Sequence, residues 1–144
     1  MNSRKLIATS LYCFLLLLLV LGICAPGGVA GQAVSGMYKV TETTDLGTQM
    51  RVTMQIRLMN SGEDRIFVTH VRLRSLRPGP SAEEPASVAL PPHASAEFTQ
   101  EFTVAKREYE LWSRGARPHL GLKVQIGERE TTMTVTLMRG PGSR

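Results

Sequence analysis

The strongest constraint on the fold is a stretch of strict alternation between apolar and polar residues from Gln49 to Leu58. Successive side chains of a β-strand point to opposite faces, so a period of two predicts a strand with one buried and one solvated face. The apolar row consists of Met50, Val52, Met54, Ile56 and Leu58. An amphipathic helix would need a period near 3.6, so this stretch predicts a β-rich domain.

Weaker alternations predict six further strands. They cover residues 37–43, 66–76, 87–90, 96–104, 120–126 and 133–137. In the strand at 66–76, Phe67, Val71 and Leu73 are expected on the buried face, opposite Ile66 and Val68. The residues between the last two strands have turn chemistry, so these strands are expected to form a hairpin.

Two segments interrupt the alternation. Residues 77–86 contain three prolines and a glycine, and proline removes backbone donors, so this segment is predicted to be an exposed loop. Residues 106–112 are predicted to form a short helical turn that brings Leu111 and Trp112 onto one side. Gly115 is expected to help end it.

Seven short strands separated by turns, without a long helix, predict an all-β fold: a seven-stranded antiparallel sandwich of the immunoglobulin-like or fibronectin-like type. The expected organisation is a signal segment at 1–33, the sandwich domain at 34–139 and a disordered tail at 140–144. Whether the strands at 50–58 and 66–76 pair with each other stays open at this level.

Two motifs suggest a family resemblance. The turn Asn60-Ser61-Gly62 follows a long alternating strand, and the stretch from Leu90 to Phe98 reads LPPHASAEF. Across residues 50–104 the chain resembles bacterial Ig-like domains of the cell-adhesion-related type. The resemblance implies an extracytoplasmic binding or spacer module.

The amino-terminal segment has the features of a secretory signal. Arg4 and Lys5 precede an apolar run at 11–24, and small residues follow up to Ala33. This pattern predicts export and cleavage after Ala30 or Ala33, hence a secreted or periplasmic protein. One alternative is an uncleaved membrane tether through residues 6–25, with the domain outside the cytoplasm. Another is a lipid anchor at Cys24, against which the bulky Ile23 argues.

Cleavage would remove both cysteines and leave a small excess of positive charge. Cys13 and Cys24 are the two cysteines of the chain, so the core of the exported domain must hold without a disulfide. Of 17 basic residues two lie in the signal, and 15 minus 12 acidic residues gives +3. This excess is too small to predict binding to nucleic acid.

The sequence predicts neither catalysis nor a bound cofactor or metal. No Gly-x-Ser-x-Gly elbow occurs, and His70, His93 and His119 stand singly without metal-ligand spacing. Several methionines occupy inward strand positions. Met37, Met59 and Met138 do not, but none has a histidine within two residues. The chain is therefore expected to be no enzyme.

Four residues are the candidates for binding. Trp112 is the one tryptophan, and with Tyr109 it is predicted either to anchor a partner or to plug one end of the sandwich; the plug is favoured. Arg72 and Arg74 share a face, where they serve as a solvated surface or as part of a cationic plate. The expected function is an exported non-enzymatic module that binds a protein or an envelope polysaccharide. The alternative is a membrane-anchored structural or assembly subunit of the envelope.

Overall fold

The structure, a computed structural model, describes residues 34–75 and 82–141. The elements are β1 (Val34–Asp45), β2 (Gln49–Asn60), β3 (Ile66–Arg74), β4 (Glu84–Leu90), β5 (Ser95–Ala105), α2 (Lys106–Ser113), β6 (His119–Ile126) and β7 (Arg129–Arg139). The predicted signal segment, the proline-rich stretch up to residue 81 and the last three residues lie outside the described residues.

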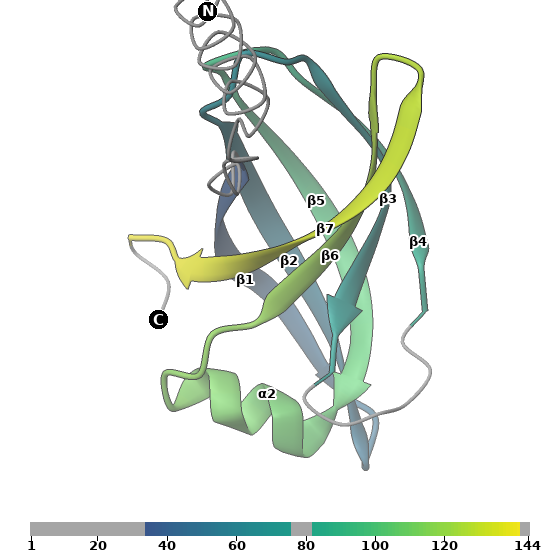
Figure 1. Ribbon diagram of the computed structural model, residues 1–144. Coiled ribbons are helices and arrows are strands. Elements are labelled where there is room, and N and C mark those ends of the chain that lie inside the picture. The colour runs from purple at the N-terminus through teal and green to yellow at the C-terminus, as the bar shows by residue number, and fades with distance from the viewer. Residues whose placement is uncertain (1–33, 76–81, 142–144) are drawn as a thin grey trace, which may run out of the picture. The chain divides into compact units, whose positions relative to one another are not determined.

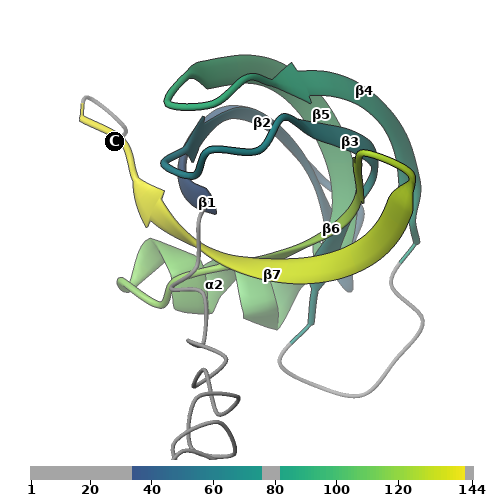
Figure 2. The same ribbon diagram turned by 45° about the horizontal axis from the view of Figure 1, so that its top comes forward.

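The strands form one sheet in the order β4-β3-β6-β7-β1-β2-β5, which curls into a nearly closed barrel (Figures 1 and 2). The all-β prediction is confirmed, and so is the hairpin of β6 and β7. The prediction of a purely antiparallel arrangement is wrong, because β1 and β7 pair in parallel. Alternation reveals which residues face inward, but it carries no information about the relative direction of strands far apart in sequence.

The core comes from the inward rows of all seven strands. The predicted apolar row of β2 is buried throughout, with Met50 the most accessible at 8% exposed. Val88, Phe102, Leu122 and Val135 belong to the same buried cluster, each from a different strand. At roughly 25 cal/mol for each Å² of apolar surface removed from water, this burial is the main stabilising contribution in a domain without disulfides.

Strand β3 departs from the prediction in its first half. Ile66 and Val68 are buried, whereas Phe67 is 37% exposed. The register against β4 and β6 shifts between Val68 and His70. A β-bulge inserts one residue and reverses the alternation beyond it, so Val71 and Leu73 face inward as predicted while the residues before the bulge do not.

Asn60 joins the turn that follows β2 to the turn between β4 and β5. Its side chain is fully buried, and Nδ2 donates to the carbonyl oxygens of Asp64 (2.7 Å), Leu90 (3.2 Å) and Pro91 (3.1 Å). Its Oδ1 accepts from the Gly62 amide at 3.0 Å. A buried amide with satisfied hydrogen bonds fixes both turns to each other.

α2 lies across one end of the sheet (Figure 1). The predicted helical turn is thus confirmed, and Gly115 follows it with a φ of 104°. The segment expected to loop out at 77–86 ends earlier than predicted, because β4 begins at Glu84 and Pro85 pairs opposite His70 at an outer strand, where a missing donor is tolerated. Across the described ranges, none of the helices is long and apolar enough to cross a membrane.

Candidate binding groove beside strand β1

Strand β1 has two halves with different surroundings. Along its whole length it pairs with β2. On its other side it pairs with β7 only over Gly36, Met37 and Tyr38, and the last bond of this contact runs from the Gly140 amide to the Tyr38 carbonyl at 2.8 Å. From Val40 to Asp45, β1 has no strand on that side within the part of the chain that is described. This segment is called the open half of β1.

The backbone groups of the open half alternate in direction. The Leu46 amide donates to the Gln49 carbonyl at the hairpin. Antiparallel pairs alternate between hydrogen-bonded and non-hydrogen-bonded, so the amides of Thr44 and Glu42 point toward β2. Those of Thr43 and Asp45 point to the open side. A bulge at Thr41, where the register shifts between Val40 and Glu42, separates the two halves.

Helix α2 forms the opposite wall. Its first amide, that of Lys106, donates to the Thr48 carbonyl at 3.0 Å, which ties the helix to the β1–β2 turn. Residues four apart share a helix face, so Glu108 and Trp112 are both buried, at 8% and 2% exposed. The prediction that Leu111 lies on the same side as Trp112 is wrong, because the helical period leaves Leu111 37% exposed.

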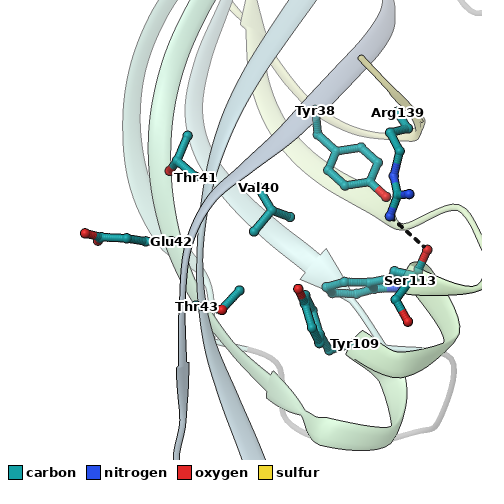
Figure 3. A pocket seen from close by; sticks show the side chains of 9 residues that line it. Tyr38, Val40, Thr41, Glu42, Thr43, Tyr109, Ser113 and Arg139 are labelled. Carbon is teal, nitrogen blue, oxygen red and sulfur yellow. Dashed lines mark hydrogen bonds between the residues drawn. The ribbon is translucent and has the colours of Figure 1, made fainter. Parts of the chain in front are cut away.

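Between these walls lies a pocket of about 220 Å³ (Figure 3). The lining residues are Tyr38, Val40, Thr41, Glu42, Thr43, Tyr109, Trp112, Ser113 and Arg139. The rings of Tyr109 and Trp112 meet edge to face, with centroids 6.3 Å apart. Figure 3 shows the Tyr38 ring and the Arg139 guanidinium at one end of the pocket, with Val40 and Thr43 along its β1 side.

Several polar groups of the pocket are available to a ligand. In the described part of the chain every fully buried side-chain nitrogen and oxygen has a hydrogen-bond partner. The Tyr38 hydroxyl and the Trp112 indole nitrogen have no hydrogen-bond partner among the described residues, so each atom keeps a little exposed surface, although the two residues are only 4% and 2% exposed. Arg139 Nη2 donates to the Trp112 carbonyl at 3.3 Å. No carboxylate of residues 34–75 or 82–141 pairs with Arg139, so its charge is uncompensated there.

At the far end of the open half, an ion pair neutralises the charge of Asp45. Lys106 Nζ donates to the Asp45 carboxylate. This bond, followed by the one from the Gly47 amide, lowers the pKa of Asp45, and the same carboxylate raises the pKa of Lys106. The groove is therefore neutral at Asp45 and positive at Arg139. Glu42 also borders the pocket, but Figure 3 shows its carboxylate directed away from Arg139 and Tyr109.

The predicted arginine set divides into two faces, because β2 and β3 are not neighbours in the sheet. On β2, Arg57 pairs with Glu97 at 2.9 Å and Arg51 with Glu101 at 3.5 Å. Both carboxylates lie on β5. The β2 arginines are thus neutralised by the adjacent strand.

On β3, Arg72 and Arg74 have no carboxylate partner within the described ranges. Arg74 Nη1 donates instead to Thr134 Oγ1 at 3.0 Å. A Cβ added to Gly121 would lie 3.7 Å from Arg74 Cγ and 3.8 Å from Arg72 Nε, so both arginines extend over this glycine. Lys123 lies on the same face and pairs with Glu130. This surface, centred on Arg72 and Arg74, is called the cationic face.

The structure brings the predicted residues Trp112 and Tyr109 into one pocket and leaves Arg72 and Arg74 on the cationic face. Sequence reasoning missed Tyr38 and Arg139, which are far apart in sequence and become neighbours only through the parallel pairing of β1 and β7. No alternation or motif signals that contact. Among the described residues, His, Cys, Asp and Glu side chains form no group of three suited to a metal ion.

The sequence matches no known family model and no curated protein. Among solved structures, a protein from Archaeoglobus fulgidus has 13% identity and a TM-score of 0.40, covering 73% of this chain and 90% of that one. A Northeast Structural Genomics Consortium target has 11% identity and a TM-score of 0.40, covering 76% and 86%. A β-glucosidase involved in saponin metabolism from intestinal bacteria has 13% identity and a TM-score of 0.30, and the match covers 16% of its chain. Likenesses this weak leave the function open.

Proposed function

We propose that this chain is an exported, non-enzymatic, Ig-like interaction module that binds an extended polypeptide segment along the open half of β1. In this proposal β1-β2-β5 and β4-β3-β6-β7 correspond to the two sheets of an Ig-like domain, joined through the β1–β7 pair. The relation to adhesion-related domains and the secreted or periplasmic location belong to the same proposal.

The observation that carries it is the open half of β1, Val40–Asp45, whose side away from β2 faces a pocket and has no strand among the described residues. An unpaired strand edge presents amides and carbonyls that can pair with an added strand. At about 3.3 Å per residue, six residues offer an edge of roughly 20 Å. The main chain would supply affinity there, and the pocket between β1 and α2 would supply side-chain selectivity.

The test uses a pool of acetylated, amidated hexapeptides with randomised residues, passed over the immobilised domain. Thr43→Pro removes an amide on the open side without removing a bond to β2. Thr43→Val keeps that amide and is the matched control. Retention that Thr43→Pro abolishes and Thr43→Val preserves supports the proposal, provided both variants keep the wild-type melting curve. Retention equal in all three forms contradicts it.

A second candidate function concerns the cationic face. Two arginines without a carboxylate partner among the described residues suit an anionic envelope polysaccharide. Retention on an immobilised sulfated polysaccharide would fall with salt. Arg72→Gln with Arg74→Gln should reduce it much more than the matched pair Arg51→Gln with Arg57→Gln. Equal loss of retention in the two double variants would mean that net charge alone causes the binding.

The rival function is a membrane-anchored structural or assembly subunit held by residues 6–25. Intact mass of the protein purified from its native envelope separates the two. A mass lacking the first 30 or 33 residues supports the exported module. A full-length mass in the membrane fraction supports the anchored subunit.

A further inference from the structure

We infer that the groove beside the open half of β1 recognises the free carboxyl terminus of its peptide, with the peptide antiparallel to β1 and its terminal carboxylate at Arg139. This inference rests on the proposed function and adds to it the ligand's chemical end group and its direction.

The end group follows from the charges along the groove. Arg139 stands at the end where the β7 contact stops, and its guanidinium has no carboxylate partner in the described ranges. A guanidinium with one donor used for a carbonyl keeps further donors in a planar fork, which suits a carboxylate. The Tyr38 hydroxyl lies beside it (Figure 3) and supplies another hydrogen bond.

The direction follows from the position of Arg139. A peptide strand added along the open half would lie on the same side of β1 as β7, whose last hydrogen bond to β1 is the one from Gly140. A peptide antiparallel to β1 enters near Asp45 and ends near Val40, so its carboxylate meets Arg139. A parallel peptide would bring its amino end to Arg139, where two positive charges repel each other. At Asp45 the Lys106 ion pair leaves no net charge to hold a terminal carboxylate.

The pocket sets the nature of the last side chain. A space of about 220 Å³ beside Val40, Thr43 and Tyr109 accommodates one side chain of the peptide. The outward positions of the peptide would face solvent, because alternate side chains of a strand point to opposite faces. We therefore expect selectivity at the carboxyl-terminal residue and little at the residue before it.

The experiment compares two randomised hexapeptide pools, both acetylated, one ending in a free carboxylate and the other in an amide. Each is passed over the immobilised domain, and retained peptides are counted by mass spectrometry. The free-acid pool should be retained about tenfold more strongly, a typical gain for a charge-assisted hydrogen bond. Arg139→Gln should remove the difference and Arg139→Lys should keep part of it. Arg129→Gln, at the other end of β7, is the matched control and should change nothing.

The outcomes separate this inference from the proposed function. Equal retention of both pools, still sensitive to Thr43→Pro, overturns the carboxylate and leaves edge recognition standing. No retention of either pool overturns both. A concentration-dependent dimer that Thr43→Pro dissociates would mean that a second copy of this chain occupies the edge, and it would overturn both as well. The pool comparison needs no variant, so it decides even if Arg139→Gln fails to fold.

Discussion

The two halves of β1 belong to one strand and both pair with β2, yet they differ in what lies along the opposite edge of the strand. In the first half Val34 and Tyr38 are buried, and β7 covers the edge. In the open half every residue from Thr41 to Asp45 is exposed. The difference arises because β7 leaves the edge at Arg139. A single strand can thus contribute to the core at one end and leave a free edge at the other.

The first prediction tests the half of β1 that β7 covers. A Cβ added to Gly36 would lie 2.6 Å from Leu137 Cδ2 and 3.1 Å from Val135 Cγ1, so Gly36 permits the close approach of β1 and β7. Gly36→Val should cost about 1–3 kcal/mol through overpacking, because the nearest atoms are ends of buried side chains that can shift only in part. Urea unfolding measures this, with Thr43→Val in the open half expected to change stability by less than ~0.5 kcal/mol. An equal loss of stability in Gly36→Val and Thr43→Val would mean that the two halves of β1 do not differ in their packing.

A second prediction concerns the wall of the groove. Trp112→Ala should cost roughly 3–5 kcal/mol, because it removes a large side chain that is 2% exposed and leaves a cavity. Leu111→Ala, one position along the helix and 37% exposed, should cost less than ~1 kcal/mol. Thermal melting of both variants checks this. A small loss in Trp112→Ala would mean that Trp112 is a ligand anchor without a role in the core.

The smallest expected effect is the pH dependence at the end of the open half. The hydrogen bond from Lys106 lowers the pKa of Asp45 below its ordinary 3.8. A carboxyl with a lowered folded pKa adds stability above its unfolded pKa, and this is lost as pH falls through the folded value. Because both groups are exposed, the contribution is small. The difference in melting temperature between wild type and Asp45→Asn should therefore begin to shrink below pH 3.8 and vanish once the pH has passed the lowered folded pKa of Asp45. A difference that does not shrink as the pH falls would contradict the assignment.

The local features of the fold could be predicted from the sequence. The inward row of β2, the β6–β7 hairpin and α2 all follow from periods and turn residues within short windows. The errors are non-local or arise from a single inserted residue. The bulge after Val68 reverses the pattern of Ile66 and Phe67 without a sequence signal. The parallel contact of β1 with β7 joins the two ends of the domain, which no window spans.

In the candidate groove, too, the residues with a local sequence signal could be predicted and those brought together by non-local pairing could not. Tyr109 and Trp112 could be singled out from the sequence because aromatic residues concentrate in one short helical segment. Tyr38 and Arg139 could not, since an isolated tyrosine in a strand and an arginine near the carboxyl end carry no local signal. Tyr38 and Arg139 become neighbours because β1 and β7 pair in parallel over three residue pairs.

Residue-resolved amide hydrogen exchange along β1 shows whether the open half of this strand is a free edge that a peptide can occupy. In the free domain we expect slow exchange of the β1 amides on both sides of Tyr38, where β2 and β7 flank the strand. Beyond Val40 we expect an alternation: the amides of Glu42 and Thr44 are protected by β2, whereas those of Thr43 and Asp45 exchange rapidly. Adding the free-carboxylate hexapeptide pool should slow Thr43 and Asp45 selectively. Protection of those two amides in the free domain, or no slowing in the presence of a retained pool, would contradict an open binding edge.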